Sequence, residues 1–261
     1  MFALLIFLLV SGSQARTLGI MSAMEIELEF ISQDMTIDRT DTIAGNVYKI
    51  GTINMVPCVA VHGGVGKVGA AYTAQTLIMQ YGVDAVIFTG VAGGINPELH
   101  IGDIVIAEKL VHHDFGQVLP ERFIPFDTVG FCADSFLAAL ALQATENIEL
   151  EVIPEEIRGE EDLPKIIMGR IATGDQFISS ESKRVWIERV FRADCVEMEG
   201  AAVAQTCVAN GVPFAIIRSL SDLANEDAEV DIQSFGLYAA KNSSLLVKEM
   251  LRLLSGQWLR D

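Results

Sequence analysis

The stretches VEMEG (residues 196–200) and RSLSD (residues 218–222) are the most informative part of this chain. The first lies between a short apolar run and a helix predicted over residues 201–210, and the second ends a strand predicted over residues 213–219. In open α/β folds, ligands bind at the edge of the sheet where such junctions lie. The two stretches therefore predict an α/β fold whose ligand site contains their acidic residues.

Carboxyl groups follow three of the predicted strands. Glu25 and Glu27 open the first helix, and Glu199 and Asp222 belong to the two stretches above. Each residue alone has an ordinary explanation as a helix-dipole partner or a helix cap. Their concentration at one edge of a sheet favours glycosidic bond cleavage, which uses a carboxylate together with a carboxylic acid.

Elsewhere the chain alternates short apolar strands with amphipathic helices. This order predicts a single α/β domain, residues 16–261, built as a three-layer αβα sandwich around a mixed, largely parallel central sheet. Residues 115–130 and 151–164 lack a clear period, and we expect the first to be a substrate or subunit-contact loop and the second a surface excursion. The predicted strands are residues 17–21, 84–89, 103–110 and 166–173 and a hairpin of 47–51 with 54–61 that turns at Thr52 and Ile53; the predicted helices are residues 23–32, 66–81, 131–147, 180–190 and 232–254.

Composition limits the partners of the protein. The 261 residues are 51% hydrophobic and 20% charged, which is typical of a globular protein. The formal net charge of −17 disfavours nucleic acid and polyphosphate, because a negative field repels both. A neutral or zwitterionic small molecule is the expected ligand.

The N-terminus carries an apolar run, FALLIFLLV (residues 2–10), followed by the small residues Ser13 and Ala15. A run of this length is too short to span a bilayer, so no stable membrane insertion is expected. It is typical of a secretory signal, here residues 1–15, which predicts export to the periplasm or the extracellular space. The alternative is a buried N-terminal strand or a misassigned start codon, with a cytoplasmic protein.

Neither the cysteines nor the glycines form a recognisable cofactor motif. The four cysteines have no zinc-site spacing, and Cys58, Cys195 and Cys207 lie in apolar segments where we expect them to be small core residues. The glycine-rich turns at residues 63–67 and 89–94 match neither a complete phosphate-binding loop nor a dinucleotide fingerprint. They are tight turns, or places where backbone amides face a ligand. No metal or organic cofactor is expected.

The segment of roughly residues 17 to 255 contains a series of motifs: GIMSAMEIE (19–27), GVGKV (64–68), TGVAGG (89–94), GDIV (102–105), TGDQFI (173–178), VEME (196–199) and SLSD (219–222). In this order and combination they resemble the 5′-methylthioadenosine/S-adenosylhomocysteine nucleosidases of the purine nucleoside phosphorylase superfamily. Each motif alone is a weak signal, whereas the set is specific.

The resemblance implies roles for individual residues. Glu27 would activate water as the general base, and Asp222 would protonate N7 of adenine, because the neutral base leaves poorly as an anion. Glu199 would hydrogen-bond the ribose hydroxyls and stabilise the cationic sugar. The other implied site residues are Met198 against the sugar, Phe177 stacked on the purine, the Ile178 backbone at the purine edge, Ser221 and Arg218 orienting Asp222 and Glu199, and Glu197 and Gly93 in the substrate site. For Met198 and Phe177, ordinary core packing is the alternative.

Water is the expected nucleophile. Phosphorylases need arginines around phosphate, whereas the first strand–helix turn offers Glu25 and Glu27 and no arginine. The resemblance therefore implies hydrolysis of 5′-substituted adenine nucleosides by a homodimer with residues 115–130 near the interface. A purine nucleoside phosphorylase and a non-catalytic secreted nucleoside-binding protein are the alternatives. The preferred 5′ substituent stays open, because residues 115–130 align poorly with the family.

Overall fold

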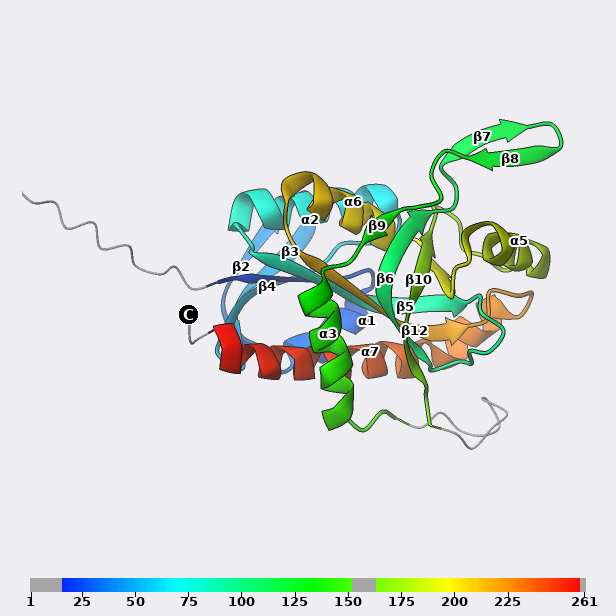
Figure 1. Cartoon of the computed structure of the whole chain (residues 1–261). Helices are drawn as coiled ribbons and strands as arrows, with labels where there is room; N and C mark the ends of the chain where they lie inside the picture. The colour runs from blue at the N-terminus through cyan, green and yellow to red at the C-terminus, as the bar shows by residue number, and fades with distance from the viewer. Residues whose placement is uncertain (1–15, 152–162, 259–261) are drawn as a thin grey trace, which may run out of the picture.

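The protein is built around one mixed β-sheet (Figure 1). The computed structural model describes residues 16–151 and 163–258. Within these residues the main sheet has ten strands, and two further strands form a separate hairpin. Along the sheet the order is β11 (Cys195–Glu197), β10 (Ile166–Thr173), β6 (Ile104–His112), β12 (Phe214–Asp222), β5 (Ala85–Gly94), β1 (Leu18–Ser22), β4 (Val56–His62), β3 (Asn46–Ile53) and β2 (Thr36–Ile43), with β9 (Phe131–Cys132) beside β6.

The pairing pattern brings the two informative stretches of the sequence together. Strands β4, β1, β5 and β12 are mutually parallel, so their carboxyl ends lie at one edge. Strand β11 pairs with β10 and turns back onto β5, where Val196 lies opposite Gly93. On the other side of β5, Asp222 is also paired with Gly93. The ends of β11 and β12 therefore flank the same residue.

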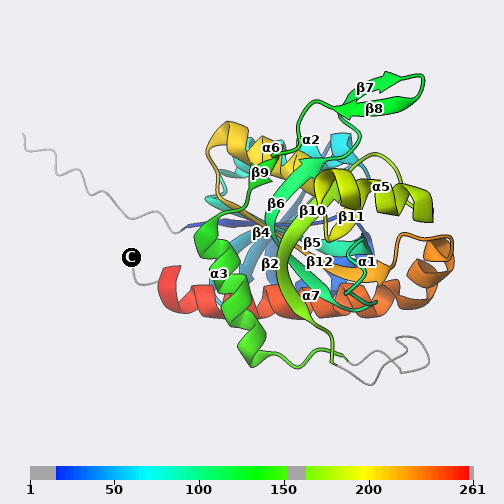
Figure 2. The same cartoon turned by 45° about the vertical axis from the view of Figure 1, so that its right-hand side comes forward.

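Helices cover both faces of the sheet, which confirms the predicted three-layer α/β sandwich (Figures 1 and 2). Apolar residues of α1 (Glu25–Ser32), α3 (Ser135–Ala144) and α7 (Ala228–Trp258) pack on one face. Those of α2 (Lys67–Tyr81) and α6 (Gly200–Asn210) pack on the other. A third cluster joins α5 (Glu181–Phe191) to the β10–β11 end. Strand β12 is buried along its whole length, as expected for a strand covered on both sides.

The predicted hairpin is present, but its turn at Thr52 and Ile53 is wrong. Strand β3 continues through both residues, and the chain reverses at Asn54 and Met55, whose φ angles are 50° and 65°. A tight hairpin requires this left-handed backbone, which asparagine adopts more easily than the β-branched Thr52 and Ile53.

Two other segments differ from the prediction. Residues 115–130 contain a hairpin, β7 (Gly116–Leu119) with β8 (Arg122–Pro125), that projects from the body of the molecule (Figure 1). Residues 131–147 begin as strand β9, and α3 starts only after Asp134, whose side chain accepts a hydrogen bond from the Leu137 N–H at 2.9 Å. The turn of the β7–β8 hairpin and the start of α3 both depend on short-range turn and capping interactions, which hydrophobic periodicity does not report.

Strand β2 has no counterpart among the predicted elements. Its sequence, TIDRTDTI, is polar and largely exposed, because the strand lies at the edge of the sheet. Charged edge strands of this kind resist pairing with other chains, and they lack an apolar signal. Residues 1–15 and most of residues 151–164 lie outside the described residues. No helix in the described part of the chain is long and apolar enough to cross a membrane.

Three of the four cysteines lie in the core, as expected. Cys58, Cys195 and Cys207 are buried in the core and Cys132 is exposed, and all four are free thiols. Burial raises the pKa of the Cys58 and Cys207 thiols to about 12. Both therefore act as small apolar core residues.

Candidate active site

A cavity of about 160 Å³ lies where the ends of β1, β5, β11 and β12 meet. A smaller cavity of about 20 Å³, lined by Ile178, Phe177, Gly93 and Asp222 among others, adjoins it. The larger cavity is lined by Ala23, Met24, Glu27, Val65, Val91, Ala92, Gly93, Phe177, Val196, Glu197, Met198, Glu199, Ser221, Asp222 and Ile232.

The structure thus gathers the residues that the sequence singled out. All of the predicted site residues line one of these two cavities except Arg218, which is fully buried behind the wall. Glu25, the other carboxyl group noted at the first helix, is exposed and lines neither cavity. Val65 and Ile232 also line the larger cavity and were not predicted. Val65 lies inside the GVGKV motif and was open to prediction, whereas Ile232 reads in sequence as one more apolar residue of a long helix.

Glu27 is held by three backbone amides. Its carboxylate accepts hydrogen bonds from the N–H groups of Ala23 (3.0 Å), Met24 (2.9 Å) and Val91 (3.1 Å). A side chain at position 90 would crowd it, because a Cβ on Gly90 would lie 2.9 Å from Glu27 Oε1. Burial raises the pKa of Glu27, and the amides only partly oppose this effect. Glu27 is therefore a fixed carboxylate with an increased affinity for a proton, as a general base requires.

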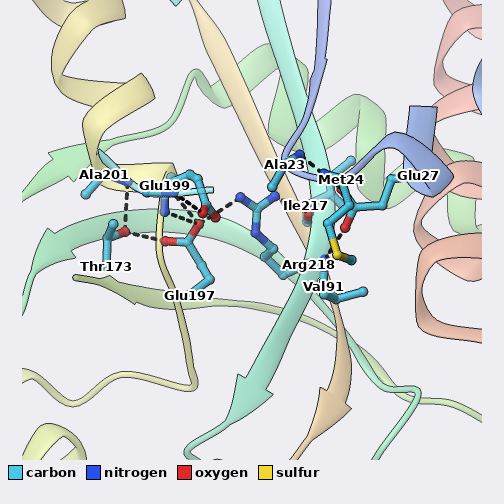
Figure 3. Close-up of polar contacts among 12 residues, drawn as sticks. Ala23, Met24, Glu27, Val91, Thr173, Glu197, Glu199, Ala201, Ile217 and Arg218 are labelled. Atoms are coloured by element: carbon cyan, nitrogen blue, oxygen red, sulfur yellow. Dashed lines mark hydrogen bonds and ion pairs between the residues drawn. The ribbon is translucent and has the colours of Figure 1, made fainter. Parts of the chain in front are cut away.

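Glu197 has its charge and hydrogen-bonding capacity fully used (Figure 3). Its carboxylate accepts hydrogen bonds from Arg218 Nη2 (2.7 Å), from the N–H groups of Glu199 (3.1 Å) and Gly200 (2.6 Å), and from the Thr173 hydroxyl. Two of these donors are amides at the N-terminus of α6, where negative charge is favourable. Glu197 therefore holds the start of α6 in place.

Arg218 lies between the glutamates of the site (Figure 3). It forms its ion pair with Glu197, and its guanidinium group stacks 4.1 Å from the centre of the Phe88 ring. The sequence interpretation placed it beside Glu199 as an orienting residue; the structure gives the direct contact to Glu197 instead. Its positive charge still acts on Glu199 and Glu27, and it partly opposes the rise in pKa that burial causes in both.

Glu199 differs from Glu197 in having little support. It occupies the N-cap position of α6, and among the described residues the Gly66 N–H, at 2.8 Å, is the hydrogen-bond donor to its carboxylate. Burial, and then the charge of Glu197, raise the pKa of Glu199 to about 7. With this one donor, the Glu199 carboxylate can still accept hydrogen bonds from the hydroxyl groups of a ligand in the cavity.

Asp222 lies on the other side of Gly93. Its carboxyl group accepts hydrogen bonds from the Ser221 hydroxyl (2.8 Å) and the Ala224 N–H (2.9 Å). A Cβ on Gly93 would come within 2.6 Å of Asp222 Oδ1, so glycine is needed at that position. Burial raises the pKa of Asp222 to about 6. An aspartic acid with this pKa can deliver a proton near neutral pH.

The wall of the cavity carries no basic side chain from the described residues. No lysine or arginine is among the described residues that line it. Over residues 16–151 and 163–258, no group of three or more His, Cys, Asp or Glu side chains is arranged to hold a metal ion. Proton transfer and hydrogen bonding are the chemistry that the residues on the wall can supply.

Comparison with known proteins identifies the family of the chain. The family model described as "Phosphorylase superfamily" matches residues 17–252. The 5′-methylthioadenosine/S-adenosylhomocysteine nucleosidase of Mycobacterium bovis is 32% identical over 92% of this chain and 99% of its own. An aminodeoxyfutalosine nucleosidase of Campylobacter jejuni is 35% identical over 91% of this chain and 99% of its own.

A solved structure is similar over the same length. The 5′-methylthioadenosine/S-adenosylhomocysteine nucleosidase of Neisseria meningitidis, in complex with methylthio-immucillin-A, has a TM-score of 0.80 and 31% identity, covering 91% of this chain and 99% of that one. The chain belongs to the phosphorylase superfamily. Within it, the resemblance to the 5′-methylthioadenosine/S-adenosylhomocysteine nucleosidases is confirmed by these relatives.

Proposed function

We propose that the protein hydrolyses the N-glycosidic bond of 5′-substituted adenine nucleosides such as 5′-methylthioadenosine and S-adenosylhomocysteine. The products are free adenine and the 5′-substituted ribose. The observation that carries the proposal is the convergence of Glu27, Glu199 and Asp222 on one cavity. A non-catalytic binding protein has no need of an acid and a base held in this way.

The three carboxyl groups divide the reaction between them. Asp222 donates its proton to N7 of adenine, so that the base leaves as a neutral molecule. Glu199 accepts hydrogen bonds from the ribose hydroxyls, and its negative charge favours the cationic sugar of the transition state. Glu27 takes a proton from the water that attacks the anomeric carbon, and the new C–O bond replaces the C–N bond.

Water is favoured over phosphate by the charge of the wall. The residues lining the cavity include four carboxyl groups, those of Glu27, Glu197, Glu199 and Asp222, and no lysine or arginine among the described residues. A phosphate dianion next to Glu27 would meet like charge without an arginine to bind it. The wall therefore disfavours a phosphorylase.

The test is the release of adenine from 5′-methylthioadenosine, with and without added phosphate. We expect release in both cases at the same rate, and methylthioribose with a free anomeric hydroxyl as the second product. Release only with phosphate would support a phosphorylase, and no release by folded protein would support a binding protein. Because the relatives include an aminodeoxyfutalosine nucleosidase, S-adenosylhomocysteine and aminodeoxyfutalosine belong in the same panel to define the 5′ substituent.

We also propose that the protein is a homodimer with residues 115–130 near the interface. The β7–β8 hairpin and its flanks expose Val118 (81%) and Phe126 (64%). A groove of about 570 Å³ beside it is lined by the apolar residues Val68, Phe115 and Phe131, among others. Exposed apolar patches of this kind are typical of protein–protein contacts. Light scattering on the purified protein tests the proposal: a monomer mass would overturn it.

Export is a separate proposal that rests on sequence alone. Residues 1–15 contain an apolar run followed by small residues, as secretory signals do. N-terminal sequencing of the native protein tests it. A mature protein beginning at Arg16 is the expected result, and one that retains residue 2 would contradict it.

A further inference from the structure

Three charged residues form a cluster outside the cavity that the proposed reaction does not use. Lys67 Nζ lies 2.6 Å from Asp114 Oδ1 and 3.8 Å from Asp175 Oδ2. The Asp175 N–H donates to Asp114 Oδ2 at 2.9 Å, and the Lys67 N–H donates to Asp175 Oδ1 at 2.8 Å. The cluster therefore joins the start of α2 to the turn after β10 and to the end of β6.

Asp175 supplies what α2 lacks. The N-cap residue of α2 is Gly66, which has no side chain to cap the helix, and no acidic residue lies in its first turn. The Asp175 carboxylate accepts the Lys67 N–H instead, which is the role of a capping side chain contributed from another segment. Gly66 has a φ of +97°, and a Cβ there would lie 3.2 Å from Asp175 Oδ1.

The preceding backbone amide, that of Gly66, reaches the site. The Gly66 N–H donates to Glu199 Oε1 at 2.8 Å. The adjacent amides of Gly66 and Lys67 therefore bind two different carboxylates, one in the cavity wall and one outside it. Moving the start of α2 away from Asp175 would also move the donor of Glu199.

We propose that Asp175, tied to Lys67 and Asp114, is a positioning residue that fixes the Gly66 N–H against Glu199 and so keeps Glu199 ready to bind the ribose. This inference rests on the proposed function for the role of Glu199. Asp175 acts through the start of α2 and is not a catalytic residue.

The contact with the Gly66 N–H affects the charge state of Glu199. Glu199 is faced by Glu197 from β11, Glu27 from α1 and Arg218 from β12. Burial and the two glutamates raise its pKa, whereas Arg218 and the Gly66 N–H lower it. Losing the Gly66 N–H would raise the pKa of Glu199 further, and less of the ionised form would be present near neutral pH.

The test is Asp175→Ala, with Asp175→Asn as the matched control. Asparagine keeps an oxygen that can accept the Lys67 N–H, whereas alanine does not. We expect kcat/KM for 5′-methylthioadenosine to fall about tenfold in Asp175→Ala, the size of a lost hydrogen bond to a charged group. We expect the acidic limb of its pH profile to move to higher pH. Asp175→Asn should stay close to the wild type, and so should Asp38→Ala on the distant strand β2.

A double-mutant cycle separates this role from general stabilisation. In a Glu199→Gln background, Asp175→Ala should have little further effect, because its effect passes through Glu199. An undiminished loss in that background, or wild-type kcat/KM and an unmoved acidic limb in Asp175→Ala, would overturn the proposal. If Asp175→Ala does not fold, Lys67→Met decides, since it keeps the backbone amide and removes only the ammonium group. The expected result is a smaller loss with a smaller shift of the limb in the same direction, and no shift would overturn the proposal.

A second readout works without turnover. The carboxyl carbon of Glu199 can be titrated by NMR in the free protein, with Glu199→Gln used to assign its signal. A higher pKa in Asp175→Ala than in the wild type supports the positioning role even if the wild type releases no adenine, which would overturn only the proposed function. An unchanged pKa would overturn the positioning role itself.

Discussion

Glu197 and Glu199 are two residues apart and both are nearly inaccessible to solvent, yet their surroundings are opposite. Glu197 accepts hydrogen bonds from Arg218, from Thr173 and from two backbone amides. Glu199 accepts one hydrogen bond, from the Gly66 N–H, among the described residues, and its pKa is raised to about 7. Within a strand, side chains two residues apart would point to the same face. Strand β11 ends at Glu197, and Glu199 is already the N-cap residue of α6, so the two side chains reach different partners.

The difference shows that the fold uses one glutamate, Glu197, for structural support and leaves the other, Glu199, available to a substrate. A buried carboxylate with a cation and several donors is stable as a charge and has no capacity left for a ligand. A buried carboxylate with only one or two donors and no ion-pair contact is costly to the fold and remains free to act on a substrate. Asp222, with two donors and a pKa raised to about 6, belongs to the second kind.

The largest expected effect comes from removing the proton of Asp222. Asp222→Asn keeps an oxygen for the Ser221 hydroxyl or the Ala224 N–H but cannot protonate the leaving base. We expect adenine release to fall by at least ~10³-fold, within the range for a lost general acid, with an unchanged thermal midpoint. Steady-state assays and thermal unfolding check this, and near-normal turnover would remove Asp222 from the mechanism.

Glu197→Gln should destabilise the fold, because Glu197 is the glutamate that supports it. Arg218 would then be a buried cation without its ion-pair partner, because its guanidinium group is fully inaccessible. We expect the free energy of unfolding to fall by about 3 kcal/mol, as measured by urea denaturation. Glu197→Gln combined with Arg218→Met should recover part of this loss. A single variant as stable as the wild type would show that the ion pair does not support the fold.

Ser221→Ala should give a smaller and more specific change. The Ser221 hydroxyl stabilises the ionised form of Asp222 and lowers its pKa, against the larger effect of burial. Without it the pKa of Asp222 rises, so the acid stays protonated to higher pH. The basic limb of the kcat/KM profile should move upward by less than about one pH unit. A downward shift would contradict the assignment of that limb to Asp222.

Much of the fold was predictable because apolar periodicity reports buried elements. Strand β12 is buried throughout and was visible as an apolar run, whereas β2 is exposed and was missed. The turn at Asn54 and Met55 depends on two backbone angles, which the hydrophobic pattern does not encode. Sequence periodicity therefore predicted the core better than the edges.

The site was predictable as a set of residues and not as a set of contacts. Motifs identified Glu27, Glu199 and Asp222, and the structure places all three on one cavity wall. The partner of Arg218 was not predictable, because Glu197 and Glu199 are only two residues apart and equally buried, so that only the orientation of their side chains distinguishes them. Asp175 belonged to a recognised motif, but its contact with α2 joins residues 108 positions apart.

The pH dependence of stability in Glu199→Gln tests the comparison most directly. Because the folded-state pKa of Glu199 is raised from 4.5 to about 7, the folded protein keeps a proton that the unfolded chain has lost. Between these pH values, wild-type stability should therefore decrease relative to Glu199→Gln as pH rises, by at most ~3 kcal/mol.

The measurement is urea denaturation of the wild type and Glu199→Gln across this pH window, with kcat/KM determined on the same samples. We expect the stability curves to diverge, so that Glu199→Gln is the more stable protein above pH 7 while its kcat/KM is lower by about tenfold or more. Parallel stability curves, or a variant that is both less stable and fully active, would contradict the view that Glu199 is kept for the ligand at the expense of the fold.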